Sequence, residues 1–422
     1  MRGAARPPGR AAGRRHAATH RAGSPVGKVM IGHPRGENTV ACSNVTVVMV
    51  HTSPVPADGP SPDAGCPPVS VVMPVRNEAR HLAEAVRHIL QQDYPGKIEL
   101  VLAVGPSRDR TLAIAEQLAA DHPGVTVVLN PTGKIPSGVN AAIKAARFGI
   151  ITRVDGHAML PPGYLRTAVR ALRETGAADV GGVMAAEGVT AFEQAVAWAM
   201  TSKAGVGGAS FHTGGQAGPV DSVYLGVYRR EAIEKAGGYD EHYLRAEDWE
   251  LNHRIRLSGG LIWFVPELRV TYRPRSSPRA LGAQYFHYGR WRRVVARQHS
   301  GTISLRYLAP PAAVSVIAAG TAAGVAGLAG LAAGAQAAVG WLALGLVIPA
   351  TYLAGIAAVA ALLGRGLTPG VRTRVPLALA TMHLCWGAGF LTSPRTLLRR
   401  RNGSASARPA APEPAAPRSV SQ

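Results

Sequence analysis

Two short polar stretches about 90 residues apart carry the residue types that could do chemistry in this chain. In the first stretch, Asp155 and His157 are separated by one residue and follow the mostly apolar run FGIIT at 148–152. A carboxylate and an imidazole at this spacing can bind one divalent cation, and the pair is compatible with Mn²⁺. A capping aspartate beside a surface histidine gives the same pattern. The DxH pattern alone therefore does not establish a metal site.

The second stretch is the acidic pair Glu247-Asp248, which opens the helical sequence EDWELNHRIRL at 247–257. The positive end of a helix dipole favours carboxylates in the first turn. A carboxylate in this position could act as a general base. The structural alternative is an acidic pair that only caps the helix.

The elements that must position these residues alternate between strand and helix. Apolar, β-branched runs predict strands, and apolar residues at helical spacing between them predict helices. The predicted strands are VSVVMPV (69–75), IELVLAV (98–104), VTVVLN (125–130) and GIITRVD (149–155). This alternation predicts an α/β fold with a mostly parallel sheet covered by helices.

Ligands of such sheets bind at the carboxyl ends of the strands. Asp155 lies at one of these ends, and Arg76, Asn77 and Glu78 follow the first strand. We therefore expect these residues at the same edge of the sheet, where a nucleotide would bind.

The character of the chain changes after Pro310. Two uncharged apolar segments, at 312–334 and 338–364, are each long enough to span a bilayer. A third segment, 375–391, is shorter and contains His383, so it could span, re-enter or lie at the interface. We predict a membrane region at 309–393 with two to three apolar helices.

Arginines between the second and third segments predict a cytoplasmic loop there, and therefore a cytoplasmic folded domain. A third segment that spans fully would leave the basic run RTLLRRR (395–401) outside, against the same rule. A re-entrant or interfacial third segment avoids this conflict, and we favour it.

Aromatic and arginine residues alternate in QYFHYGRWRRVVARQ (284–298), just before the membrane region. Contact with nucleic acid is one interpretation. We favour an interfacial amphipathic segment at 276–308, with arginines facing lipid phosphates and the aromatic residues at headgroup level; these aromatic residues are Tyr285, Phe286, Tyr288 and Trp291.

Composition adds weaker constraints. The net charge of +21 indicates anionic partners, although a bias toward arginine across the whole chain would also produce it. The three cysteines are far apart, which favours neither a disulfide framework nor a zinc site. Residues 1–66 and 394–422 hold little apolar periodicity, and we predict a disordered basic arm and tail.

Four segments, taken in order and spacing, resemble family 2 glycosyltransferases, in particular the membrane-attached branch that makes succinoglycan-type exopolysaccharides. The resemblance covers about residues 68–310 and rests on the following segments: VSVVMPVRNEARHLAEAVRHILQQDYP, NPTGKIPSGVNAAIKAARFGIITRVDGHA, VYLGVYRREAIEKAGGYDE and EDWELNHRIRLSGG. It implies a catalytic domain at 67–275 with the nucleotide-sugar-binding glycosyltransferase A-type fold, and an inverting transferase.

The resemblance also assigns roles. The family's metal-binding DxD element falls on Asp155 and His157, with histidine in place of the second aspartate, and implies a divalent cation, Mn²⁺ or Mg²⁺. The family's base falls on Asp248, and Glu247 flanks it. Donor binding maps onto the following residues: Pro74, Arg76, Asn77, Glu78, Asp109, Lys134, Asn140 and Asp155. Gly105 stands where the family usually has an acidic residue, so uridine is only the default nucleotide.

These features predict transfer of a sugar from a nucleotide-sugar donor, a UDP-sugar by default, to a hydroxyl of a lipid-linked or growing glycan in extracellular polysaccharide synthesis. The predicted location is the plasma membrane, multi-pass, with no nucleic-acid partner. Two alternatives stay open: a polyprenyl-phosphate sugar synthase, and a non-catalytic membrane-anchored protein that binds sugars or nucleic acid. The intact Glu247-Asp248 pair favours a hydroxyl acceptor over a phosphate.

Overall fold

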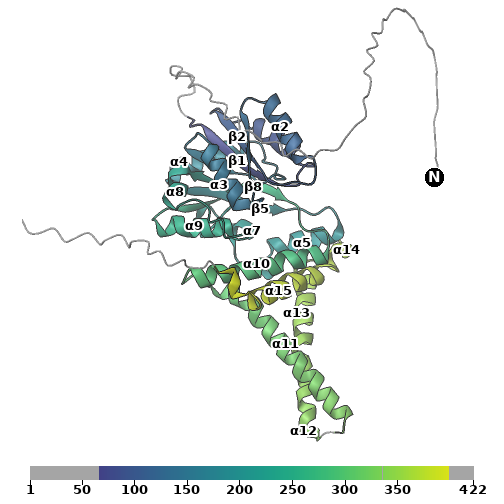
Figure 1. Cartoon of the computed structure of the whole chain (residues 1–422). Helices are drawn as coiled ribbons and strands as arrows, with labels where there is room; N and C mark the ends of the chain where they lie inside the picture. The colour runs from purple at the N-terminus through teal and green to yellow at the C-terminus, as the bar shows by residue number, and fades with distance from the viewer. Residues whose placement is uncertain (1–65, 335, 399–422) are drawn as a thin grey trace, which may run out of the picture. The chain divides into compact units, whose positions relative to one another are not determined.

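The computed structural model describes residues 66–334 and 336–398. The predicted arm at 1–66 and tail at 394–422 lie almost wholly outside these residues. A mixed eight-stranded sheet, in the order β3-β2-β1-β4-β7-β5-β8-β6, forms the centre of the folded domain (Figure 1). Its strands are β1 (Val69–Val75), β2 (Ile98–Val104), β3 (Val125–Leu129), β4 (Ile150–Arg153), β5 (Asp179–Ala186), β6 (Gly218–Pro219), β7 (Tyr224–Arg229) and β8 (Ile262–Tyr272).

The first half of the domain is the predicted alternation. β1 pairs in parallel with β2 and β4, and β2 pairs in parallel with β3. The connecting helices are α1 (Leu82–Leu90), α2 (Thr111–Asp121) and α3 (Ile135–Ala145). The predicted α/β fold with a mostly parallel sheet is confirmed. One boundary differs: β4 ends at Arg153, so Asp155 lies in the loop just beyond the strand.

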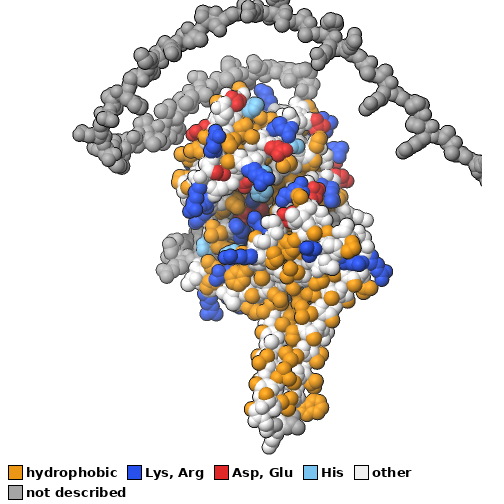
Figure 2. Space-filling view, turned by 90° about the vertical axis from the view of Figure 1, so that its right-hand side faces the viewer, with side chains coloured by type: hydrophobic (Ala, Val, Ile, Leu, Met, Phe, Trp, Pro, Cys, Tyr) orange, Lys and Arg blue, Asp and Glu red, His pale blue; other side chains and the backbone are white. Residues whose placement is uncertain are grey.

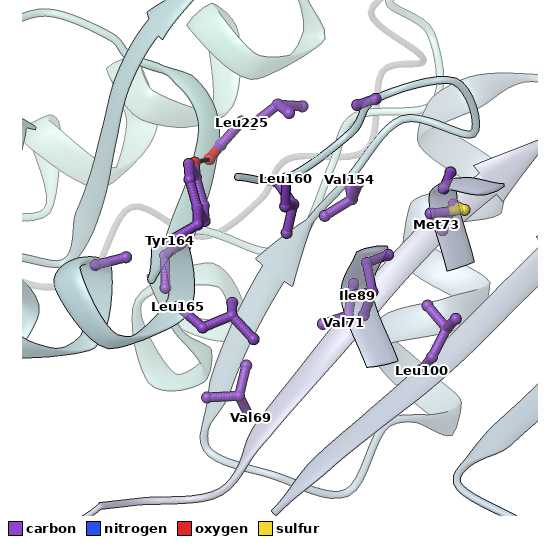
Figure 3. Packing of buried hydrophobic residues seen from close by; sticks show 14 of the residues in the cluster. Val69, Val71, Met73, Ile89, Leu100, Val154, Leu160, Tyr164, Leu165 and Leu225 are labelled. Atoms are coloured by element: carbon purple, nitrogen blue, oxygen red, sulfur yellow. Dashed lines mark hydrogen bonds between the residues drawn. The ribbon is translucent and has the colours of Figure 1, made fainter. Parts of the chain in front are cut away.

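Both faces of this sheet are buried, which explains why its strands are apolar without alternation. Val69, Val71 and Met73 pack on one face, beneath α1 and α4 (Tyr164–Thr175). Val72 packs on the other face, in a cluster with residues of α3. Figure 3 shows the first cluster, in which the Tyr164 hydroxyl donates a hydrogen bond to the Leu225 carbonyl at 2.9 Å.

The second half places β7 antiparallel between β4 and β5. The predicted helix at 247–257 is present as α9 (Glu247–Leu257), and it ends before Gly259, whose φ of +88° suits glycine. The glycine-rich segment at 205–218 forms short elements rather than one open loop; these are the end of α6 (Lys203–Val206), α7 (Ser210–Thr213) and the start of β6.

A layer of helices lies beneath the sheet domain (Figure 1). It contains α5 (Ala191–Thr201), α10 (Pro278–Gln298) and α15 (Val375–Leu391). Glycines let α10 and α15 approach closely: a Cβ added at Gly289 would lie 2.0 Å from the Trp386 carbonyl oxygen, and one at Gly389 would lie 2.0 Å from the Phe286 carbonyl oxygen. Small residues permit this kind of helix contact. The third apolar segment therefore packs along α10.

Two of the four aromatic residues of α10 are placed differently from the prediction, whereas Phe286 and Tyr288 are partly exposed. Tyr285 and Trp291 are buried in protein contacts, with 6% and 5% of their surface exposed. Tyr285 packs against α15, and Trp291 packs with Tyr243. Neither residue therefore faces a headgroup layer, because α15 and the loop before α9 cover them.

Two helices leave this layer together (Figure 1). α11 (Leu305–Ala332) and the continuous stretch Trp341–Leu363, formed by η1 (Trp341–Leu346) and α13 (Val347–Leu363), are long and apolar enough to cross a membrane. Their hydrophobic side chains are largely exposed, and Figure 2 shows an apolar stalk beside a charged folded domain. A soluble core helix would instead bury such a surface.

Candidate active site

Arg153 joins the polar stretch that contains Asp155 to the one that contains Glu247 and Asp248. It is the last residue of β4, and its guanidinium forms ion pairs with Asp155 at 3.2 Å, with Glu247 at 3.3 Å and with Asp248. The loop after β4 and the first turn of α9 therefore meet at one point, although about 90 residues separate them in the chain.

The charge balance at this point is unusual because Arg153 is buried. Only 5% of its side chain is exposed. Burial by itself lowers the pKa of Arg153, but Asp248 and Asp155 hold it well above its ordinary value. A buried charge needs such partners. The arginine in turn lets three carboxylates share a small volume without strong mutual repulsion.

The acidic pair divides into an exposed and a buried member. The Asp248 side chain is 35% exposed, whereas the Glu247 side chain is 9% exposed. Burial, and then the neighbouring Asp248 charge, raise the pKa of Glu247. The Tyr239 hydroxyl donates a hydrogen bond to Asp248 Oδ1 at 3.1 Å. Asp248 is therefore accessible to a substrate and fixed from two sides, as a general base requires.

The predicted cation pair lies beside a third acidic residue. His157 Nδ1 is 3.0 Å from Glu78 Oε1, which brings the loop after β1 to the loop after β4. This hydrogen bond is the largest cause of the raised pKa of His157. A histidine that donates one ring N–H to a carboxylate presents its other nitrogen to a metal, which is the common arrangement around metal-binding histidines.

The donor set fits a cation that is shared with a ligand. Among the described residues, no cluster of three or more His, Cys, Asp or Glu side chains could enclose a metal ion by itself. Asp155 and His157 instead offer one oxygen and one nitrogen, and the Asp155 side chain is 25% exposed. A cation held there would complete its coordination with oxygens of a bound diphosphate and water.

The other predicted donor-binding residues lie around the carboxyl ends of β1, β2 and β3. Asn77, whose φ is +56°, accepts a hydrogen bond from the Arg108 backbone N–H at 2.8 Å. Asp109 accepts bonds from Ala79 N–H and from the Thr111 hydroxyl and N–H. The Thr111 hydroxyl bond contributes most to lowering the pKa of Asp109. Asp109 thus fixes the loop after β1 against the start of α2.

Arg76 and Lys134 are both exposed and approach the same place. A Cβ added at Gly133 would lie 3.4 Å from Arg76 Nη1, so the Arg76 guanidinium lies next to the residue that precedes Lys134. Pro74 lies within β1, at the sheet edge below them. The two cations are therefore available to an anionic ligand at this edge.

Asn140 is used differently. Its side-chain amide donates to the Tyr239 carbonyl at 2.8 Å and accepts from the Tyr239 N–H at 2.9 Å. Both polar atoms are therefore committed to holding the segment that carries Tyr239. Asn140 therefore positions the tyrosine that contacts Asp248, and its predicted role in donor binding stays a prediction.

Sequence reasoning missed two residues of this site, Arg153 and Tyr239. Arg153 had a signal, because a charged residue at the end of a buried apolar strand needs a partner. No sequence pattern indicated Tyr239, because its contact with Asp248 depends on the course of the loop before α9.

An α/β sheet with acidic residues converging at its carboxyl edge defines a class of proteins that bind nucleotides or their conjugates there. Comparison with known proteins makes the class specific. The sequence profile described as "Glycosyl transferase family 2" matches residues 70–237. The succinoglycan biosynthesis protein ExoA of Rhizobium meliloti (strain 1021) is 32% identical over 328 residues, which cover 76% of this chain and 93% of that protein. The chain therefore belongs to glycosyltransferase family 2, and it is a glycosyltransferase.

Two further proteins show weaker likeness. The dolichyl N-acetyl-alpha-D-glucosaminyl phosphate 3-beta-D-2,3-diacetamido-2,3-dideoxy-beta-D-glucuronosyltransferase of Methanococcus voltae is 23% identical over 57% of this chain and 77% of its own length. The solved structure of the mannosyltransferase PcManGT from Pyrobaculum calidifontis, in complex with GDP-Man and Mn²⁺, aligns with a TM-score of 0.48 and 20% identity over 78% of this chain and 87% of that chain.

Proposed function

We propose that this enzyme is an inverting glycosyltransferase that moves a sugar from a nucleotide-sugar donor to a hydroxyl of a lipid-linked or growing glycan in extracellular polysaccharide synthesis. The observation that carries the proposal is the set of ion pairs through which Arg153 joins Asp155 to Glu247 and Asp248. These ion pairs bring Asp155, which would help to bind the donor, next to Asp248, which would activate the acceptor hydroxyl. ExoA, named for succinoglycan biosynthesis, is the relative that supports the polysaccharide role.

The proposed donor site lies at the carboxyl ends of β1, β2, β3 and β4. Arg76 and Lys134 would contact the negatively charged donor, beside Pro74, Asn77, Glu78 and Asp109. A UDP-sugar is the default donor, and Gly105 in place of the usual acidic residue leaves the base contact open. Asp155 and His157 would hold Mn²⁺ or Mg²⁺, and when bound this cation would neutralise charge on the leaving diphosphate.

In the proposed reaction, Asp248 accepts the proton of the acceptor hydroxyl while the hydroxyl oxygen attacks the anomeric carbon. The bond between that carbon and the diphosphate oxygen breaks, and its electron pair leaves with the nucleoside diphosphate. The attack comes from the face opposite the leaving group, so an α-linked donor sugar gives a β-linkage. Arg153 orients Asp248, since its guanidinium contacts that carboxylate directly.

We further propose that α11 and the stretch Trp341–Leu363 cross the plasma membrane and that the catalytic domain faces the cytoplasm. The apolar surface of these helices and the arginines of the following loop, Arg365, Arg372 and Arg374, support this orientation. The segment α15, which packs along α10, fits an interfacial position better than a third span. Nucleotide sugars are cytoplasmic, so this placement would give the site its donor.

The family assignment removes the alternative of a non-catalytic binding protein. Transfer to polyprenyl phosphate itself is the second candidate. A phosphate oxygen is already ionised and needs no base. Asp248, exposed and held by Arg153 and Tyr239, therefore favours a hydroxyl acceptor.

The test is Asp248→Asn in the full chain, assayed in membranes with a panel of labelled nucleotide sugars followed by lipid extraction. We expect transfer to fall about 10²–10⁴-fold while donor binding is retained, because only the base is lost. Glu234→Gln, which neutralises an exposed acid on α8 (Arg230–Lys235), serves as the matched control. Unchanged transfer by Asp248→Asn would remove the base assignment.

A further inference from the structure

A cavity lined by none of the proposed donor residues lies where the folded domain meets the apolar stalk. Its volume is about 510 Å³, within the range of small-molecule sites. It is lined by the segment that contains α7, by the residues around β6, by α9 and by the start of α11. Figure 1 shows α7 and α9 on the side of the sheet that faces α10 and the start of α11. Its lining includes Asp221, Trp249, Arg256 and Arg306.

The cavity has an excess of positive charge. Arg256 and Arg306 line it, and among the described lining residues Asp221 is the single acidic one. Arg256 pairs with Asp221 at 2.9 Å, and the Asp221 side chain is 58% exposed. Arg306 donates only to the Tyr307 hydroxyl in the hydrogen bonds of the described residues. Asp221 therefore balances the charge of Arg256, whereas no carboxylate of the described residues balances the charge of Arg306.

A third arginine, Arg292, packs against Trp249, which lines the cavity. The Arg292 guanidinium stacks between Trp249 and Tyr307, with its central carbon 4.1 Å and 3.8 Å from the two ring centres. Arg292 is 6% exposed and donates a hydrogen bond to the Thr302 carbonyl, but within the described residues it forms no ion pair with a carboxylate. Burial, opposed in part by Tyr307, lowers its pKa. A buried cation without a carboxylate partner is costly unless an anion approaches it.

Several donors around this cavity are unused. Within the described residues, the Nε atoms of Arg256 and Arg292 and the indole Nε1 of Trp249 are buried and have no hydrogen-bond partner. Buried N–H groups are nearly always paired, so donors left without a partner call for an explanation. Two of these three donors belong to residues that line the cavity. An anion rich in acceptor oxygens would satisfy them.

We propose that this cavity binds the phosphate or diphosphate group of a lipid-linked acceptor. Arginines recognise phosphate oxygens through charge-assisted hydrogen bonds. The start of α11 lines the cavity, since Arg306 is the second residue of that helix, so a lipid chain attached to the phosphate could follow the apolar helices. Trp249, which lines the cavity, is the neighbour of Asp248 on α9, so the cavity and the proposed base share one helix. The inference rests on the proposed function and names its acceptor class.

The binding experiment uses the full chain in phosphatidylcholine vesicles and needs no turnover. The probe is polyprenyl diphosphate, compared with phosphatidylglycerol at the same mole fraction and with inorganic pyrophosphate. We expect Arg306→Gln and Arg256→Gln each to weaken polyprenyl diphosphate binding about tenfold, the loss typical of one charged hydrogen bond. Asp221→Asn should strengthen binding, because it frees Arg256 from its carboxylate.

The matched control is Arg279→Gln, which removes an exposed arginine at the start of α10, outside the cavity. It should leave the affinity within about twofold of the parent chain, because exposed charges contribute little. Weaker binding of pyrophosphate with the same dependence on Arg306 and Arg256 would support the phosphate chemistry. If phosphatidylglycerol binds as well as polyprenyl diphosphate, the cavity is a site for bulk acidic lipid and the proposal fails.

Binding of a labelled nucleotide sugar separates this inference from the proposed function, and it also shows that each variant is folded. If donor binding and sugar transfer are intact but neither arginine variant weakens polyprenyl diphosphate binding, only the acceptor site is overturned. If the arginine variants behave as expected but no sugar is transferred from any donor, the proposed function fails while the phosphate site stands.

Discussion

The Arg153 guanidinium donates a hydrogen bond directly to the Asp248 carboxylate, linking the end of β4 to the first turn of α9. The same guanidinium contacts Asp155 and Glu247. In the proposed mechanism these three acids serve the donor side and the acceptor side of one reaction. Arg153 is therefore the residue on which the relative position of both sides depends.

Replacing Arg153 tests this dependence. Arg153→Met would leave three neighbouring carboxylates without their cation, and breaking a buried ion pair in this way costs about 3–5 kcal/mol of folding stability. Arg153→Lys keeps the charge but loses the planar fork that reaches several carboxylates. We expect the lysine variant to fold, to bind donor with nearly unchanged KM, and to lose about 10–100-fold in kcat.

Initial rates over a range of donor and acceptor concentrations measure this split between KM and kcat. Arg166→Gln is the control, since Arg166 on α4 forms an exposed ion pair with Asp93 and contacts none of the three acids. An equal loss in Arg166→Gln, or a kcat unaffected by Arg153→Lys, would contradict the role assigned to Arg153.

The hydrogen bond between Glu78 and His157 predicts how the enzyme depends on its cation. Glu78→Gln removes a carboxylate that orients the histidine, and such changes cost about 10–100-fold in metal affinity. His157→Ala should cost at least as much. His157→Asp should restore binding and shift the preference from Mn²⁺ toward Mg²⁺, since Mg²⁺ prefers oxygen ligands. Titration of Mn²⁺ by electron paramagnetic resonance measures each affinity.

The sign of the pH dependence follows from the pKa of His157, which is raised above its ordinary value of 6.5 mainly by Glu78. A protonated imidazole cannot bind a cation, so Mn²⁺ affinity should be full above the raised pKa and fall as the pH drops through it. In Glu78→Gln the fall should begin at lower pH. An affinity that is constant through mildly acidic pH would rule out His157 as a ligand.

Asp179, at the start of β5, predicts a pH-dependent stability. It is fully buried, and burial raises its pKa well above the ordinary value of 3.8. At a pH between the ordinary pKa of 3.8 and the raised pKa of the folded state, Asp179 has lost its proton in the unfolded chain but keeps it in the folded chain. The stability of the folded chain therefore falls as the pH rises through this range. Asp179→Asn cannot ionise, and we expect it to be about 1–3 kcal/mol more stable than the parent at pH 7 and nearly equal at pH 4.

Thermal unfolding of both proteins in detergent across this pH range gives the comparison. Asp121→Asn, at the exposed end of α2, should show no such crossover. A parallel pair of stability curves for Asp179→Asn and the parent chain would show that Asp179 is solvated or paired in the folded state.

The contact between α10 and α15 predicts the effect of one added methyl group. In Gly289→Ala the new Cβ would lie 2.0 Å from the Trp386 carbonyl oxygen, which neither backbone can avoid without moving. We expect a loss of about 3 kcal/mol or more, at the upper end of overpacking effects. Gly355→Ala on α13 is the matched control, because its Cβ would meet no atom within 4 Å. It should be neutral or slightly stabilising.

Melting temperatures of the two variants in the same detergent provide the measurement. Equal melting temperatures would mean that α15 does not pack along α10 in the folded protein. In that case the third apolar segment would be free to span the membrane.

The sequence by itself determined the first half of the fold and the residue types of the site. Strands such as Val69–Val75 are apolar without alternation, and this pattern is typical of parallel strands buried on both faces. Asp155 follows one of them, so its place at the carboxyl edge followed from the order of elements. Helix α9 was predictable because its acidic first turn and terminal glycines mark both ends.

The tertiary structure decided which of these residues meet. No local pattern brings Arg153 to Asp248 or Tyr239 to the same carboxylate, because those contacts depend on β7 inserting antiparallel between β4 and β5. Likewise, the alternation of aromatic and arginine residues predicted an interfacial segment that includes Tyr285 and Trp291, but not that α15 would cover part of it. Sequence patterns report which face of an element is apolar, whereas the partner that buries this face is set by long-range packing.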